Sequence, residues 1–138
     1  MTLFEEYAEA ANGLIYVATE KDGQPSLRIM GFGMDPKQPN HWYLVSQPDA
    51  NKMVDLKQNE KVAIMTYLSF ENGGKRIESN QATMEPSKKT WADVKDCFTN
   101  PVFHKNHPHP EKEVLLELTI HSARLSAFSG DETVTFND

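Results

Sequence analysis

Two positively charged residues, Arg28 and Lys52, stand where a charge is unfavourable unless it meets an anion. Arg28 lies in the apolar run 27–30, which predicts a strand, and a guanidinium there must reach water or bind an anion. Lys52 is expected in the first turn of a helix, where a cation opposes the helix dipole. Ser46, which ends the preceding strand, and the free N–H groups of the helix start could complete a phosphate site. The residues alone leave open that both cations are exposed and paired with surface acids.

A second candidate is a group of histidines. His104, His107 and His109 fall within six residues, and imidazoles at such spacing can bind zinc or nickel. Pro108 and Pro110 interrupt any helix that would place two of the rings on one face. We therefore interpret the group as part of a solvated loop, and no metal site is predicted.

The common catalytic signatures are missing from the sequence. It has no Gly-rich loop followed by Gly-Lys-Ser or Gly-Lys-Thr, and no GxGxxG, GxSxG or HExxH motif. A Cys–His pair is formally possible, but Cys97 adjoins Phe98 and is interpreted as a packing residue. Catalytic residues stay unknown at this stage.

Composition narrows the class of protein. The 138 residues suit one domain, spanning positions 1–138, and a single cysteine excludes an intrachain disulfide. The 20 acidic and 14 basic residues give a net charge of −6, which disfavours a nucleic-acid partner. No apolar run approaches the roughly 20 residues that span a bilayer, and the first residues lack the basic region of a secretory signal. We expect a cytoplasmic protein with no membrane partner.

Runs rich in β-branched and aromatic residues predict about six strands joined by short turns. These runs cover residues 14–19, 26–34, 41–47, 61–69, 76–84 and 114–125, and a short strand could follow at 133–136. Asp22-Gly23 is typical of a hairpin turn between the first two strands. The pattern predicts a mainly β fold, a closed or partly closed antiparallel barrel with short helices.

The short helices are predicted from their capping residues. Thr2 begins the first helix and has Glu5 at the spacing of a capping box. Asp49 is the candidate cap of a helix that runs to about residue 58, and Ser87 is the candidate cap of a third helix. Segment 100–110 contains three prolines and three histidines and is predicted to be a loop.

Five motifs then follow one another in a recognisable order. They are the turn Asp22-Gly23-Gln24-Pro25, the strand with Arg28, the strand WYLVS at 42–46, NKMVDLKQN at 51–59 and KVAI at 61–64. In order and spacing they resemble the pyridoxamine 5′-phosphate oxidase-like FMN-binding split-barrel family. The resemblance covers most of the chain and implies a six-stranded antiparallel split β-barrel. It also implies a homodimer with two FMN molecules bound between the protomers.

The resemblance implies a cofactor site on particular positions of this sequence. The residues concerned are Arg28, Ile29, Met30, Ser46, Gln47, Lys52, Gln81 and Trp91. Arg28 would approach the FMN phosphate or the ribityl chain, Ser46 and Lys52 would hold the phosphate, and Gln47 would line the same pocket. Ile29 and Met30 would lie along the isoalloxazine edge, where their backbone groups could reach its polar atoms. Gln81 and Trp91 could complete the pocket of the partner chain.

The leading hypothesis for function is an FMN-dependent oxidoreductase that acts with a small-molecule electron donor or acceptor. The flavin itself would carry the redox chemistry, so no general base is needed in the chain. Enzymes that oxidise pyridoxamine phosphate end in a segment rich in Arg and Leu that clamps the substrate phosphate. This sequence ends at residues 135–138 without one, so that activity is not expected.

Three alternatives stay open from the sequence. The protein could be a non-catalytic, stress-related FMN-binding protein. The barrel could instead bind a deazaflavin or haem, with His41, His104, His107 or His109 as an axial ligand. It could also be an interaction domain without a cofactor.

Overall fold

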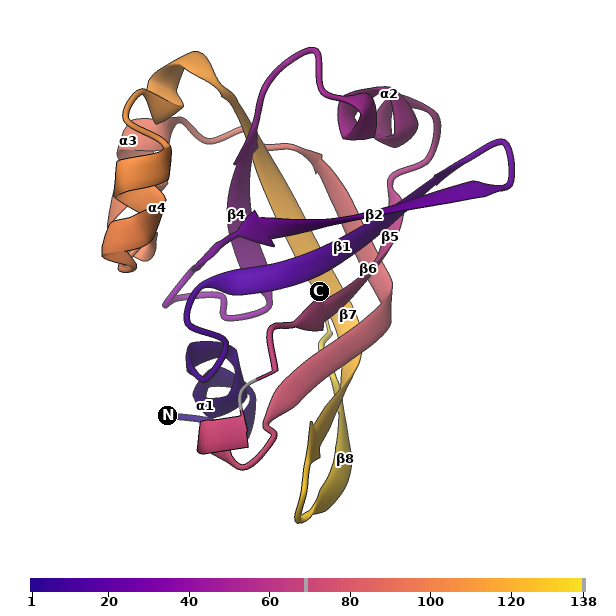
Figure 1. Ribbon diagram of the computed structural model, residues 1–138, viewed down its shortest axis with the longest axis vertical. Helices are drawn as coiled ribbons and strands as arrows, with labels where there is room; N and C mark the ends of the chain where they lie inside the picture. Colours follow the sequence, from indigo (N-terminus) through magenta and orange to yellow (C-terminus); the bar gives the residue numbers. More distant parts are fainter. Residues whose placement is uncertain (69, 138) are drawn as a thin grey trace.

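The computed structural model describes residues 1–68 and 70–137, in which eight strands form one antiparallel sheet. The strands are β1 Leu14–Lys21, β2 Gln24–Gly31, β3 Gly33–Met34, β4 His41–Ser46, β5 Lys61–Thr66, β6 Arg76–Pro86, β7 Val114–Ala127 and β8 Gly130–Thr135. Their order is β2-β1-β5-β6-β7-β4-β3, and β8 pairs with β7. Figure 1 shows the sheet curling so that β2 approaches β4 across the fold. The predicted mainly β fold is confirmed as a half-barrel, with a strand count slightly different from six.

Short helices cover the ends and one side of the sheet. They are α1 Leu3–Glu9, α2 Asn51–Gln58, α3 Trp91–Val94 and α4 Pro101–Asn106, with 3-10 turns at Phe70–Asn72, Lys95–Cys97 and Pro110–Lys112. In Figure 1, α2 lies at one end of the half-barrel and α1 at the other, whereas α3 and α4 stand outside β4. No helix in the described ranges is both long and apolar enough to cross a bilayer.

The strand pattern explains two separate cores. Alternate residues of β1, such as Ile15 and Val17, point into the curl of the sheet, where they join the main core. Strand β4 is buried on both faces. Its Leu44 belongs to the main core, whereas Tyr43 belongs to a second cluster that includes Phe103 of α4. The second cluster fixes the α3–α4 segment against the outside of the barrel.

Several local predictions are confirmed. The capping box of Thr2 and Glu5 begins α1, with the Glu5 amide donating to Thr2 Oγ1 over 3.2 Å. Asp22 and Gly23 form the hairpin turn with φ angles of 54° and 83°. These positive angles are those of the turns that match the right-handed twist of paired strands.

Other local predictions are wrong. Segment 100–110 is not all loop, because Asn100 caps α4 and Pro101 occupies its first turn, where the missing N–H costs nothing. The cap of α2 is Ala50 rather than Asp49, and Thr90 rather than Ser87 caps α3.

The expected strand boundaries also change. The strand expected over 26–34 breaks at Phe32 into β2 and β3. The strand expected over 61–69 ends at Thr66, and its last expected residue lies outside the described residues.

The backbone of Gly33, the first residue of β3, passes very close to a neighbouring segment. A Cβ atom there would lie 2.8 Å from the Cys97 carbonyl oxygen, and backbone cannot move aside easily. We expect Gly33→Ala to lower the free energy of unfolding by about 1–3 kcal/mol, as overpacking does. Urea denaturation measures it. Gly31→Ala is the matched control, because its Cβ would meet mainly the Phe103 ring at 3.1 Å and should cost less. Equal stabilities of the two variants would contradict the prediction.

Candidate functional site

Arg28 lies on β2, opposite Val17 of β1, with its side chain largely covered. Its Nη1 donates to Thr19 Oγ1 over 2.7 Å and to the Val17 carbonyl oxygen over 3.3 Å. Its Nη2 is 4.0 Å from Asp55 Oδ2, at the outer limit of an ion pair. Burial lowers the pKa of Arg28, and the negative charge of Asp55 opposes that shift. The guanidinium is thus fixed in direction without a close carboxylate partner.

Lys52 is the second residue of α2, as predicted. Burial lowers the pKa of its ammonium, the positive charge of Arg28 lowers it further, and Glu113 partly offsets both effects. Within residues 1–68 and 70–137, Lys52 has no hydrogen-bond or ion-pair partner, and no side chain caps the start of α2. The structure therefore brings two cations together beside a helix start with free N–H groups. This arrangement suits an anion better than two independent surface pairs would.

Ser46 and Gln47 lie at the end of β4, directly before the segment that leads to α2. The buried Ser46 hydroxyl donates to the Gln47 carbonyl oxygen over 3.0 Å. Gln47 Nε2 donates to Glu113 Oε1 over 3.1 Å, and Glu113 is also the acid whose charge acts on Lys52. These contacts connect the end of β4 with the neighbourhood of Lys52.

The other predicted site residues lie in different environments. Ile29 is half exposed on the outside of β2, whereas the Met30 side chain lies in the main core, so only its backbone could meet a ligand. Gln81 is exposed on β6 beside a break in the pairing register with β7. Trp91 begins α3 and packs on Phe98, with ring centroids 5.0 Å apart. No contact described for residues 1–68 and 70–137 joins Gln81 or Trp91 to the two cations.

The sequence reasoning missed the polar residues that support Arg28. Thr19 occupies an inward position of β1, and Asp55 is a buried carboxylate on α2. The signal available in the sequence was a threonine in phase with the apolar residues Ile15 and Val17. Such a threonine is often read only as a good strand former.

An apolar hollow of about 520 Å³ lies on the outer face of β1, β2 and β5. Its lining residues are Tyr16, Ala18, Leu27, Ala63, Ile64, Met65 and Leu68. Leu27 is 70% exposed and belongs to this continuous apolar patch. This face is therefore a candidate surface for contact with another protein chain.

A larger hollow lies elsewhere in the described chain and does not suit a phosphate. It measures about 720 Å³ and lies between α1 and the segment before α4. Its wall carries Glu5, Glu9 and Asp96, whose charges would repel an anion. On chemical grounds we assign the candidate site to the two cations instead.

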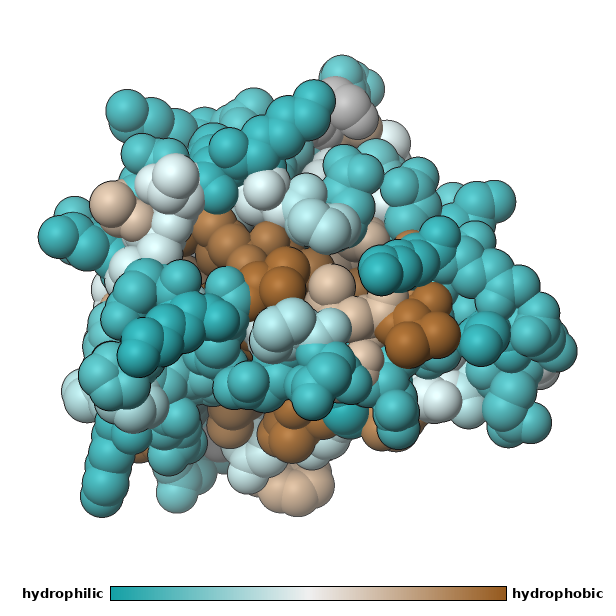
Figure 2. Space-filling model, turned by 90° about the horizontal axis from the view of Figure 1, so that it is seen from above, coloured by the Kyte–Doolittle hydropathy of each residue, from teal (hydrophilic) through white to brown (hydrophobic). Residues whose placement is uncertain are grey.

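From the side where α2 lies, Figure 2 shows an apolar recess within a mostly hydrophilic surface.

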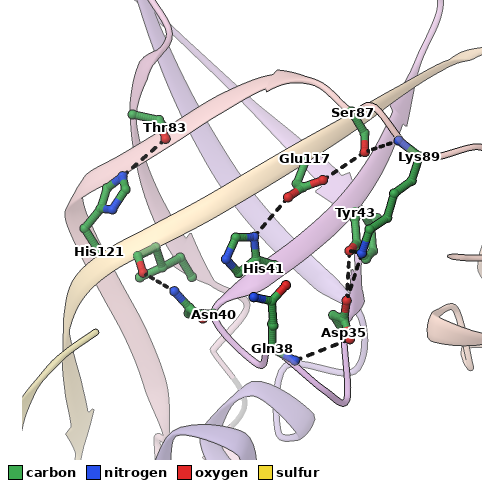
Figure 3. Close-up of polar contacts among 11 residues, drawn as sticks. Asp35, Gln38, Asn40, His41, Tyr43, Thr83, Ser87, Lys89, Glu117 and His121 are labelled. Carbon is green, nitrogen blue, oxygen red and sulfur yellow. Dashed lines mark hydrogen bonds and ion pairs between the residues drawn. The ribbon is translucent and has the colours of Figure 1, made fainter. Parts of the chain in front are cut away.

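A separate polar cluster lies between β4, β7 and the segment before α3 (Figure 3). Tyr43 OH donates to Asp35 Oδ2 over 2.9 Å and accepts from Lys89 Nζ over 2.8 Å. Burial raises the pKa of Tyr43 to about 12, and hydrogen bonds from the Lys37 and Gln38 amides help to keep the pKa of Asp35 low despite its burial. The cluster is a neutral phenol held between a cation and a carboxylate, which fastens the turn before β4 to the segment before α3.

A hydrogen-bonded chain in the same view joins β4 and β7 to the segment that follows β6. His41 Nδ1 lies 2.9 Å from Glu117 Oε2, and Ser87 Oγ donates to Glu117 Oε1 over 2.8 Å (Figure 3). The serine contacts the carboxylate and not the imidazole, so the order of contacts differs from that of a catalytic triad.

The three clustered histidines point to different partners. His104 Nε2 lies 2.7 Å from the Phe98 carbonyl oxygen, His107 Nδ1 lies 2.8 Å from Glu113 Oε2, and His109 Nδ1 lies 3.5 Å from Glu111 Oε1.

Cys97 behaves as a packing residue. Burial raises the pKa of its thiol, with the charge of Asp35 acting in the same direction. It packs against the second cluster, and a raised thiol pKa leaves little thiolate at neutral pH.

The antiparallel half-barrel is the fold of the split-barrel proteins related to pyridoxamine 5′-phosphate oxidase. The family model described as Pyridoxamine 5′-phosphate oxidase matches residues 3–127, and the chain belongs to this family. No functionally curated protein matches the sequence.

Solved structures share the fold at low sequence identity. General Stress Protein 26 from Bacillus anthracis str. Sterne is 18% identical with a TM-score of 0.69, and the match covers 99% of this chain and 100% of that one. A pyridoxamine 5′-phosphate oxidase-related, FMN-binding protein from Nostoc punctiforme is 12% identical with a TM-score of 0.64, covering 100% and 98%. A heme binding protein from Mycobacterium smegmatis is 14% identical with a TM-score of 0.74, covering 98% of this chain and 59% of that one.

Proposed function

We propose that this protein binds FMN and acts as an FMN-dependent oxidoreductase with a small-molecule electron donor or acceptor. The observation that carries the proposal is that Arg28 and Lys52 lie close enough for their charges to interact, beside a helix whose start no side chain caps. A phosphate monoester would satisfy the free N–H groups and relieve the repulsion between the two cations. The chemistry of the residues present therefore fits the phosphate end of FMN.

The remaining residues have defined tasks in this proposal. Arg28, Lys52 and the first turn of α2 bind the phosphate, and Ser46 and Gln47 close the site from the end of β4. The exposed Ile29 side chain and the Met30 backbone position the ring system along β2. Bound flavin supplies hydride and electron transfer, so the protein needs to bind, orient and shield it.

We further propose that a second copy of the chain covers the apolar face of β1, β2 and β5. A charge-free hollow with a 70% exposed leucine favours an apolar partner surface. FMN would lie between the protomers, with Gln81 and Trp91 available to complete the pocket of the partner.

Cofactor titration tests the flavin assignment directly. Purified protein should quench the fluorescence of added FMN and bind it more tightly than riboflavin, which lacks the phosphate. Absence of FMN binding would refute the assignment. Anaerobic NADH or NADPH should then bleach the bound flavin. If neither nucleotide does so, the protein is not a pyridine-nucleotide oxidoreductase, and the non-catalytic FMN-binding alternative is favoured.

Haem is a second candidate ligand because the heme binding protein from Mycobacterium smegmatis shares this fold with a TM-score of 0.74. The two candidates differ in spectrum. Titration with haem should leave the spectrum of free haem unchanged if the protein is specific for FMN. A shifted Soret band with a saturable affinity would favour haem instead.

A further inference from the structure

Thr19 occupies a position between the candidate phosphate-binding arginine and a buried acid. Its hydroxyl oxygen accepts a hydrogen bond from Arg28 Nη1 over 2.7 Å, and the same hydroxyl donates to Asp55 Oδ2 over 2.7 Å. The threonine is 2% exposed and Asp55 is 9% exposed, so water has little access to the contact. One hydroxyl thus connects β1, β2 and α2.

The interposed hydroxyl keeps the two opposite charges apart. Arg28 Nη2 is 4.0 Å from Asp55 Oδ2, too far for a hydrogen bond. A carboxylate in direct contact with a guanidinium commonly forms two parallel hydrogen bonds and occupies a whole edge of the group. Because the Thr19 proton satisfies Asp55, the carboxylate does not need that edge.

The hydrogen bond from Thr19 to Asp55 also fixes the position of helix α2. Asp55 lies three residues after Lys52 on α2, so the bond from Thr19 anchors the turn that follows the one carrying the lysine. The alignment of Arg28 and the placement of Lys52 therefore depend on one side chain of β1.

We propose that Thr19 is a positioning residue for phosphate binding: it directs the Arg28 guanidinium and holds Asp55 off it, which leaves the arginine available to a phosphate monoester. This inference rests on the proposed function, because it concerns the same site. In this proposal Asp55 competes with the phosphate for the Arg28 guanidinium, and the hydrogen bond from Thr19 restrains Asp55.

Binding of FMN and riboflavin to defined variants tests the inference. Thr19→Val keeps the shape of the side chain and removes the hydroxyl, so Asp55 should turn to Arg28. We expect the affinity for FMN to fall about tenfold, as for the loss of one charge-assisted contact, with riboflavin affinity unchanged. Thr19→Ser, which restores the hydroxyl, should bind FMN within about twofold of the wild type on the same grounds.

The double variant Thr19→Val/Asp55→Asn separates positioning from a general structural role. Removal of the competing charge should return most of the lost FMN affinity, whereas a purely structural defect would grow worse with the second change. Thermal denaturation of each variant without ligand reports stability independently. Asp55→Asn alone keeps an acceptor for the Thr19 hydroxyl, so it should bind FMN at least as tightly as the wild type, and it serves if Thr19→Val does not fold.

The possible results are distinguishable. A wild-type protein that binds FMN no better than riboflavin refutes the phosphate site itself, and this inference with it. If the wild type prefers FMN and Thr19→Val keeps the full preference, only the inference is overturned. It is equally overturned if the double variant binds FMN as weakly as Thr19→Val, or if Asp55→Asn alone loses the preference.

Discussion

Lys52→Ala is expected to weaken FMN binding about tenfold to a hundredfold, the loss typical of one charge-assisted contact, and to leave riboflavin binding unchanged. The lysine has no ion-pair or hydrogen-bond partner within the described ranges 1–68 and 70–137, so its removal disturbs no internal contact there. Burial and the positive charge of Arg28 both lower the pKa of Lys52, and a bound phosphate dianion would offset the repulsion between the two cations. Fluorescence titration with the two flavins gives both affinities.

Matched variants make this prediction specific. Lys57→Ala removes an exposed cation from the last turn of the same helix and should leave FMN affinity within about twofold, as weakly interacting surface charges do. Arg28→Ala should resemble Lys52→Ala. Unchanged titrations in both Arg28→Ala and Lys52→Ala would show that the phosphate is bound elsewhere.

Ala63→Asp is expected to convert the proposed homodimer into a monomer. Ala63 lines the apolar hollow on the outer face of β1, β2 and β5, and an unpaired carboxylate buried there by a second copy would cost about 3–5 kcal/mol. The dimer dissociation constant should therefore rise by at least about a hundredfold. Sedimentation velocity over a range of protein concentrations measures the change.

The Ala63→Asp variant should also bind FMN more weakly, because the partner chain that completes the proposed pocket is lost with the dimer. Val102→Asp is the control, since Val102 is an exposed apolar residue on α4 that does not line the hollow. It should remain a dimer with wild-type FMN affinity. A wild-type protein that sediments as a monomer with FMN bound would show that the pocket needs no second copy.

The sequence was informative where local chemistry decides the structure. The strands follow from alternating apolar residues, and α1 follows from the capping box of Thr2 and Glu5. Prolines usually break helices and so predict a loop over 100–110, but Pro101 lies at the one end of a helix that tolerates proline, and α4 forms. In the site, the unfavourable surroundings of Arg28 and Lys52 favour a shared anion no more than two surface ion pairs; the structure adds that the charge of Arg28 acts on Lys52.

The polar support of the site could not be foreseen in the same way. Thr19 and Asp55 are 36 positions apart, and their contact exists only because α2 packs on β1. Gly33 gives another example. Only glycine fits at this position because the Cys97 carbonyl oxygen, which belongs to a segment distant in the sequence, would lie too close to a Cβ atom. Contacts of this kind follow from the closed fold and not from neighbouring residues.

The order of the strands has a consequence for how the protein folds. β2 and β3 are separated by one residue in the chain, yet they stand at opposite ends of the hydrogen-bonded order, and Arg28 and Ser46 lie on β2 and β4, towards those two ends. A folding intermediate that holds only the β1–β2 and β7–β8 hairpins would therefore lack the phosphate site. Pairing of distant strands is slow because chain entropy is lost before the contacts form. Capture of FMN in a refolding experiment should accordingly accompany the last kinetic phase, in which the sheet curls and brings its two ends together.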